Sequence, residues 1–283
     1  TDLLRKNGYW VGLDGRHQHL DGRGRDLDHV TNTLIQLGMR GEAFESRFDH
    51  FVQRASTKGE ALWAVDERIE AALDKVENSQ PFFLYFGFNQ PHRKWGNDHE
   101  LIDPKGLQLP EDWPDLPEVR LDYARYLAEV RDLDTGIGLI EHVLEKRGIK
   151  DDTVIIFMGD NGEALLRGKG TLFDRGTHVP LIVRWPGKIK AGTSSNHLIS
   201  GVDLAATILE MAGVKKAPGM TGQSFLNLLL GNAYTPRKYV FAERGWHFGP
   251  ITRMDGFDLS RSVMSDRYLL IYNSIPERSY SPV

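Results

Sequence analysis

The chain has 283 residues, of which 40% are hydrophobic and 26% are charged, a composition typical of a globular protein. Its 35 basic and 39 acidic residues leave a net charge of -4, so no basic excess favours nucleic acid or an anionic membrane as a partner. The absence of cysteine excludes disulfides and thiolate metal sites within these residues, and no apolar run reaches the length of a membrane-spanning helix.

The first part of the chain alternates between helix and strand patterns. Residues 1–8 (TDLLRKNG) are typical of the last turns of a helix closed by glycine, and a short strand is predicted at 9–13. Residues 60–76 carry apolar side chains at helical spacing, which predicts an amphipathic helix that covers a sheet. Residues 82–88 (FFLYFGF) are apolar on both faces, a pattern that favours a central strand of a parallel sheet.

The same alternation continues through the middle of the chain. Residues 93–117 are rich in proline and charge, and we expect them to form an excursion over the site. A long helix is predicted at 119–146, although two glycines weaken its middle. Apolar runs at 154–158 and 179–185 predict two strands, and residues 202–212 predict another helix. Strands that alternate with helices indicate an α/β fold, with a mostly parallel sheet between helical layers.

The pattern changes from about residue 233. Short strands joined by loops are predicted at 239–242 and 268–272, which indicates a smaller β-rich C-terminal subdomain. The predicted division is therefore an α/β domain at 1–232 and a subdomain at 233–283. Because the first residue is not methionine and the last residues form no terminal element, we expect both parts to be incomplete.

The most informative stretch follows the predicted strand at 154–158. Asp160 and Asn161 lie just past the end of this strand, and ligands bind at that edge in open parallel sheets. A carboxylate and an amide carbonyl are hard oxygen donors suited to Ca²⁺ or Mg²⁺. Lys169 follows in a glycine-flanked loop, and a metal ion and a lysine on one rim would suit an oxyanion ester. The alternative reading of Asp160-Asn161-Gly162 is a simple Asx turn at the end of a strand.

Three motifs in this stretch resemble those of the sulfatase family, within the alkaline phosphatase superfamily. They are DNG at 160–162, GKGT at 168–171, and GTHVP at 176–180 running into WPG at 185–187. The resemblance, to arylsulfatases and N-sulfoglucosamine sulfohydrolases, implies an alkaline-phosphatase-like α/β fold and an enzyme that hydrolyses a sulfate ester or sulfamate, on a small molecule or a saccharide. It also implies a Ca²⁺ site at Asp160 and Asn161, with Mg²⁺ as the alternative ion.

The resemblance assigns roles to residues in four segments. Lys169 is similar to the family lysine that contacts the ester oxygens, and His92, in a Gln-Pro-His sequence, resembles the histidine that donates to the bound sulfate. Arg175 and His178 are candidates for further substrate contacts. For each of these residues the alternative is an ordinary loop side chain that faces solvent.

The segment GRHQHLDG at 15–22 departs from the family pattern G-K-x-H-x-G. Either Arg16 or His17 takes the place of the family lysine, and His19 is the expected catalytic histidine. A guanidinium binds a tetrahedral oxyanion well, often through two hydrogen bonds. The spacing of His17 and His19 also suits a zinc site, but no third ligand accompanies them.

Sulfatases attack sulfur with a formylglycine made from a C/S-x-P-x-R motif, which precedes the pair matched here by Gly8-Tyr9. We expect this nucleophile to lie outside the chain, so that these residues alone would be inactive. The sequence SIPER at 274–278 fits the motif formally but lies on the wrong side of the other motifs, and we interpret it as coincidence. The family also suggests a periplasmic or extracellular location.

Two other functions remain open from the sequence. A phosphomonoester or phosphonate ester hydrolase of the same superfamily would bind a group of the same tetrahedral geometry. A sulfatase-like protein without catalytic activity would bind sulfated glycans and would lack the C/S-x-P-x-R motif.

Overall fold

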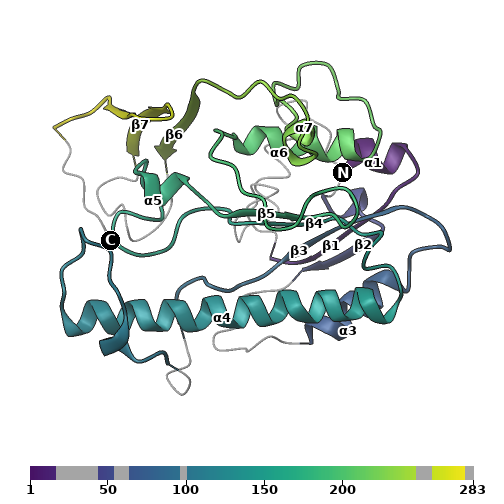
Figure 1. The fold of residues 1–283 in the computed structure, drawn as a ribbon, viewed down its shortest axis with the longest axis horizontal. Helices are drawn as coiled ribbons and strands as arrows, with labels where there is room; N and C mark the ends of the chain where they lie inside the picture. The colour runs from purple at the N-terminus through teal and green to yellow at the C-terminus, as the bar shows by residue number, and fades with distance from the viewer. Residues whose placement is uncertain (17–43, 54–63, 96–100, 247–256, 278–283) are drawn as a thin grey trace. The chain divides into compact units, whose positions relative to one another are not determined.

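A computed structural model of the chain describes residues 1–16, 44–53, 64–95, 101–246 and 257–277 (Figure 1). The chain forms two compact units: unit 1 comprises Thr1–Leu107 and Ala124–Arg147, and unit 2 comprises Gln108–Tyr123 and Gly148–Val283. The domain boundary near residue 233 stays a prediction. Among the described residues, none of the helices combines the length and apolar character that crossing a membrane would require.

Unit 1 contains a parallel sheet with the strand order β2-β1-β3. The strands are β1 (Trp10–Gly15), β2 (His50–Gln53) and β3 (Phe82–Gly87). The predicted strands at 9–13 and 82–88 are therefore confirmed. Among the described strands of this sheet, however, β1 is central and β3 lies beside it at an edge. An apolar pattern reports which faces of a strand are buried and not which strands it pairs with.

Two helices and most of a third, whose first residues 117–123 belong to unit 2, complete unit 1. It also contains two 3₁₀ turns, η1 (Phe44–Arg47) and η2 (Pro104–Gly106). Helix α1 (Asp2–Lys6) ends as predicted, with Gly8 at a φ of +86°. Helix α3 (Val65–Leu73) buries its apolar face, as its spacing indicates. The long helix α4 (Pro117–Lys146) is also confirmed, and its C-terminal end is joined to α3 by an ion pair of 2.7 Å between Lys146 Nζ and Glu70 Oε1.

After residues 108–123, unit 2 continues with two paired strands, β4 (Ile155–Met158) and β5 (Leu181–Arg184). Both strands were predicted, but they pair antiparallel. The rule that ligands bind past the strand ends of a parallel sheet therefore cannot be applied to this pair. The direction of β5 depends on how the chain returns to β4, and the local sequence pattern does not report it. Helices α5 (Asp174–Thr177), α6 (Gly201–Met211) and α7 (Leu226–Leu229) follow in unit 2.

The last described strands of unit 2 form an antiparallel sheet with the order β6-β7-β8. Strands β6 (Val240–Trp246) and β8 (Leu269–Asn273) confirm the short strands predicted at 239–242 and 268–272. Strand β7 (Phe257–Met264) lies between them and was not predicted. The fold class is confirmed as α/β with a β-rich C-terminal part.

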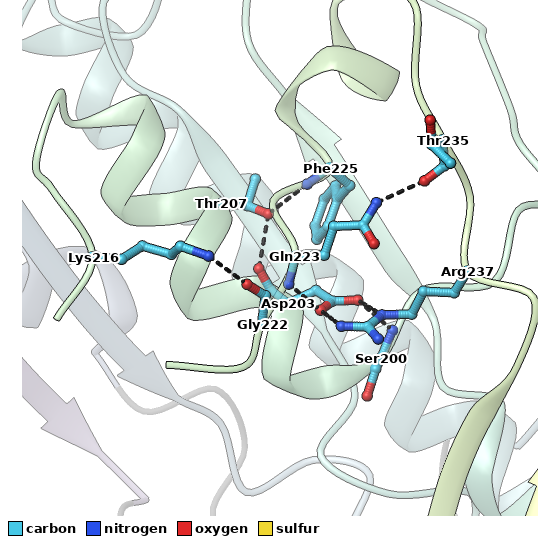
Figure 2. A network of polar contacts seen from close by, with 9 residues as sticks. All are labelled: Ser200, Asp203, Thr207, Lys216, Gly222, Gln223, Phe225, Thr235 and Arg237. Atoms are coloured by element: carbon cyan, nitrogen blue, oxygen red, sulfur yellow. Dashed lines mark hydrogen bonds and ion pairs between the residues drawn. The ribbon is translucent and has the colours of Figure 1, made fainter. Parts of the chain in front are cut away.

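A buried carboxylate fixes α6 to the chain that follows it (Figure 2). The Asp203 side chain is fully buried and accepts hydrogen bonds from the Ser200 amide (3.0 Å), the Gln223 amide (2.7 Å) and Arg237 Nε (2.7 Å). Burial alone would raise the pKa of Asp203, but the hydrogen bonds from Arg237 and the two amides lower it below its usual range. Asp203 is therefore an ionised structural anchor of unit 2.

Candidate active site

The predicted metal and lysine residues lie on one compact loop of unit 2, residues 159–180, here called the β4–β5 loop. Its two ends meet, because the Gly159 amide donates a hydrogen bond to the Pro180 carbonyl (3.1 Å). Within it, the Lys169 amide donates to the Glu163 carbonyl at 2.7 Å. The segment that carries Lys169 is thus folded back onto the residues directly after Asp160 and Asn161. The DNG and GKGT motifs belong to one local structure.

Glycines in the motifs are required by close backbone contacts inside this loop. A Cβ atom on Gly162 would lie 1.8 Å from the Arg175 carbonyl oxygen. A Cβ atom on Gly168 would lie 2.1 Å from the Glu163 carbonyl oxygen, and one on Gly176 would lie 2.4 Å from that of Thr171. No real Cβ atom approaches a carbonyl oxygen so closely, so the loop can adopt this conformation only with glycine at these positions.

Asp160 and Asn161 offer oxygen atoms of the type that Ca²⁺ and Mg²⁺ prefer. Asp160 is exposed, and the Asn161 Nδ2 atom donates to the Gly162 carbonyl at 2.7 Å. This hydrogen bond fixes the amide orientation and makes Oδ1 the Asn161 atom that would face a cation. These two residues therefore suit Ca²⁺ by the type of atom they offer. They supply two ligands, whereas Ca²⁺ takes six to eight oxygen ligands. Within the part of the chain that the structure describes, no cluster of three or more His, Cys, Asp or Glu side chains could hold a metal ion.

Arg175 is held by residues from the predicted excursion at 93–117. Its Nη2 atom lies 2.7 Å from Asp112 Oδ1, and its guanidinium lies 5.2 Å from the centre of the Trp113 ring. The end of the excursion therefore contacts the β4–β5 loop within unit 2. His178 lies on the same loop, with Nδ1 3.5 Å from Asp174 Oδ2, and both side chains are exposed. A substrate contact by Arg175 or His178 stays a prediction.

In unit 1, two other candidates, Arg16 and His92, are both hydrogen-bonded to Asn89. Arg16 follows β1 and donates from Nη1 to Asn89 Oδ1 (2.7 Å). The His92 amide donates to the Asn89 carbonyl (2.8 Å). The His92 ring is hydrogen-bonded through Nδ1 to the Arg93 carbonyl. Since a carbonyl only accepts, Nδ1 carries the proton of this hydrogen bond.

Sequence reasoning missed a buried polar cluster around Asp14, which precedes Arg16 by two residues. Asp14, the fifth residue of β1, is 1% exposed and accepts a hydrogen bond from Arg68 Nε at 2.9 Å. His50 Nε2 lies 3.4 Å from the other Asp14 oxygen, and Lys75 Nζ lies 2.9 Å from His50 Nδ1. An aspartate inside the apolar run WVGLDG was the available signal, because a buried carboxylate requires a cationic partner.

The remaining candidates, His17 and His19, lie outside the described residues, and of the SIPER segment at 274–278 only Arg278 does. The roles of these histidines stay predictions. So does the expectation that Arg16 and His92 in unit 1 act on the same group as Lys169 in unit 2.

Comparison with known protein families gives two overlapping matches. The family described as Sulfatase matches residues 3–214, and that described as N-sulphoglucosamine sulphohydrolase, C-terminal, matches residues 162–277. The chain is 33% identical over 175 residues to an ulvan-active sulfatase of Formosa agariphila, an alignment that covers 62% of this chain and 28% of that protein. The chain spans about half or less of the length of the curated relatives it matches.

Solved structures share the fold. One, described as a complex with its substrate D-glucosamine-2-N,6-O-disulfate, has a TM-score of 0.68 at 18% identity, over 96% of this chain and 72% of that chain. Another, a phosphonate monoester hydrolase of Agrobacterium radiobacter, has a TM-score of 0.66 at 18% identity, over 97% of this chain and 73% of that chain. Likeness at this identity concerns the fold alone, and it confirms the alkaline-phosphatase-like α/β architecture.

Proposed function

Because the chain belongs to the sulfatase family, within the alkaline phosphatase superfamily, we propose that the protein hydrolyses a sulfate ester or a sulfamate on a saccharide. The observation that carries the proposal is the β4–β5 loop, in which the residues of the DNG and GKGT motifs form one compact backbone structure. The saccharide is supported by relatives, one named for activity on ulvan and another solved with a disulfated glucosamine.

Each candidate has a chemical task in this reaction. Lys169 would neutralise the negative charge that builds on the leaving oxygen or on the equatorial sulfuryl oxygens. Arg16 or His17 would bind the anion, for which a guanidinium is well suited. His92, whose Nδ1 proton is bonded to the Arg93 carbonyl, would donate to the sulfuryl group from Nε2 as a doubly protonated imidazolium. His19 would serve as the catalytic histidine.

Asp160 and Asn161 would hold a divalent cation through their side-chain oxygens. We favour Ca²⁺, with Mg²⁺ as the alternative, because both prefer carboxylate and carbonyl ligands. When bound, such an ion withdraws electron density from a sulfuryl oxygen and so favours attack at sulfur. The attacking group is a formylglycine by family resemblance, and we place it outside residues 1–283. Arg175 and His178 would contact the remainder of the substrate.

Substitution of Lys169 tests the proposal in the complete gene product. We expect Lys169→Ala to lower kcat for a sulfate ester by about 10²- to 10³-fold, as loss of one charge-stabilising group does at other sites. The thermal unfolding midpoint should stay close to that of the wild type, since the variant keeps the backbone amide of residue 169, which donates to the Glu163 carbonyl. Exposed Lys188 provides the control, and Lys188→Ala should keep full activity. A folded Lys169→Ala variant with wild-type turnover would refute this role.

The alternative activity is phosphomonoester or phosphonate ester hydrolysis. It is supported by the structural likeness to a phosphonate monoester hydrolase. Assays with p-nitrophenyl sulfate, p-nitrophenyl phosphate and a phosphonate monoester separate the alternatives, since the preferred ester should have the higher kcat/KM. If the protein binds sulfated glycans and hydrolyses none of these esters, it is instead a binding protein with a sulfatase fold.

A further inference from the structure

We propose that Asn89 is a positioning residue for the substrate anion. It holds the Arg16 guanidinium in one orientation without neutralising its charge, and it sets the turn that carries His92. This inference rests on the proposed function, because it concerns the same sulfuryl group. It adds a residue that the family motifs in the sequence do not mark.

The backbone around Arg16 is fixed by contacts between the ends of β1 and β3. The Arg16 amide donates to the Gly87 carbonyl at 2.9 Å. A Cβ atom on Gly15, which has a φ of +94°, would lie 2.2 Å from the Gly87 oxygen, and one on Gly87 would lie 2.2 Å from the Arg16 oxygen. The two strand ends are therefore packed at backbone contact. This packing places Asn89, two residues after Gly87, within reach of the Arg16 side chain.

The chemistry of Asn89 suits an anion site better than a carboxylate would. Its Oδ1 atom accepts from Arg16 Nη1 at 2.7 Å and thereby orients the guanidinium, but an amide carries no charge that would cancel that of arginine. Asp14, two residues before Arg16, is paired with Arg68 and His50. The acceptor beside Arg16 is thus the neutral Asn89 amide, whereas the buried Asp14 carboxylate is paired with Arg68.

Asn89 also contacts His92, the second anion-binding candidate in unit 1. Its carbonyl accepts the His92 amide at 2.8 Å, which closes the turn from Asn89 to His92. One residue therefore contacts Arg16 through its side chain and the His92 segment through its backbone. A change of the side chain alone should affect Arg16 and leave this turn hydrogen bond in place.

Asn89→Asp separates a positioning role from a structural one, because it keeps the shape and the acceptor atom and adds one negative charge. We expect the KM for p-nitrophenyl sulfate and the inhibition constant of inorganic sulfate to rise together, by about tenfold or more, since a like charge beside a bound anion is strongly unfavourable. The thermal unfolding midpoint should not fall, because aspartate pairs with arginine at least as well as asparagine does. The matched control is Asn196→Asp, which adds the same charge at an exposed position and should leave both constants unchanged.

A double-mutant cycle provides the second test. Asn89→Ala should raise KM in the wild-type background and have little further effect in an Arg16→Ala background, because Asn89 acts through Arg16. If Asn89→Asp leaves KM and sulfate inhibition unchanged, or if the two alanine effects are additive, the positioning role is wrong while the proposed function stands. If the wild-type protein itself neither hydrolyses a sulfate ester nor binds sulfate, both proposals are wrong.

Discussion

Gly162 illustrates, at the scale of a single residue, why a motif glycine is a structural requirement. The contact of 1.8 Å that its Cβ atom would make with the Arg175 carbonyl oxygen involves backbone, which cannot turn aside as a flexible side chain can. The neighbours of Asp160 and Asn161 are therefore constrained by the packing of the loop itself. Asp160 and Asn161 thus supply the chemical groups of the site, whereas Gly162 allows the backbone conformation that presents them.

We predict that Gly162→Ala lowers the free energy of unfolding by about 1–3 kcal/mol, the usual cost of forcing extra atoms into a packed site. Gly138→Ala is the control, because nothing lies within 4 Å of its added Cβ and the residue is exposed within α4. That change should stabilise the protein by about 0.5–1 kcal/mol, since alanine is the better helix former. Urea unfolding of both variants measures the two effects, and equal midpoints would contradict the contact.

Candidate residues that lie close together in the sequence could be grouped in advance, and residues paired across the chain could not. Asp160, Asn161 and Lys169 lie in short motifs, and the structure places all three on one loop. Asn89 and Asp14 accept hydrogen bonds from Arg16 and Arg68, which lie 73 and 54 residues away in the sequence. A single sequence contains no signal for such pairs beyond the residue types themselves.

Helix α6 shows the same dependence at the scale of an element. The apolar pattern predicted the helix, but its attachment to the rest of unit 2 comes from Asp203 at its third position. Arg237, which binds this carboxylate, lies 34 residues after Asp203 in the sequence and follows α7 (Figure 2). One buried ion pair therefore holds together elements that the local pattern treats as independent.

We predict that Asp203→Asn lowers stability at neutral pH by about 3–5 kcal/mol, since it leaves Arg237 without its buried partner. Because the pKa of Asp203 is lowered in the folded state, its contribution is complete above the ordinary aspartate value of about 4 and is lost as the pH falls further through the lower folded-state value. Thermal unfolding between pH 2 and pH 6 should thus show a smaller acid dependence in the variant. The exposed Glu243–Arg261 pair, at 3.2 Å, is the control, and Glu243→Gln should cost at most about 1 kcal/mol.

Strand existence was easier to predict than strand pairing. The runs that became β1, β3, β4 and β5 are apolar and bounded by turn residues, so each is visible locally. The antiparallel direction of β5 against β4, and the central place of β1, depend on contacts made only after the chain returns. Strand β7 was missed because Arg261 interrupts the alternation of apolar and polar residues in its sequence FDLSRSVM, which also lacks a continuous apolar run.

At the scale of the whole molecule, the proposed metal would act as a stabilising ligand. A cation that binds only the folded state raises the free energy of unfolding by about 2.7 kcal/mol when its concentration is 100 times its dissociation constant. We predict that CaCl₂ raises the thermal unfolding midpoint of the complete gene product and that EDTA reverses the effect. Asp160→Ala should abolish the shift, whereas Asp152→Ala, at an exposed position before β4, should keep it. A calcium effect of equal size in all three proteins would exclude Asp160 as a ligand.

The division into units has a practical consequence for dissecting this protein. Unit 1 is assembled from two stretches of sequence, with residues 108–123 of unit 2 inserted between them. No single cut of the gene can release either unit whole, because a break after residue 107 or after residue 147 assigns part of α4 to the wrong product. A polypeptide that contained unit 1 alone would have to omit residues 108–123 and join residues 107 and 124 through a designed linker.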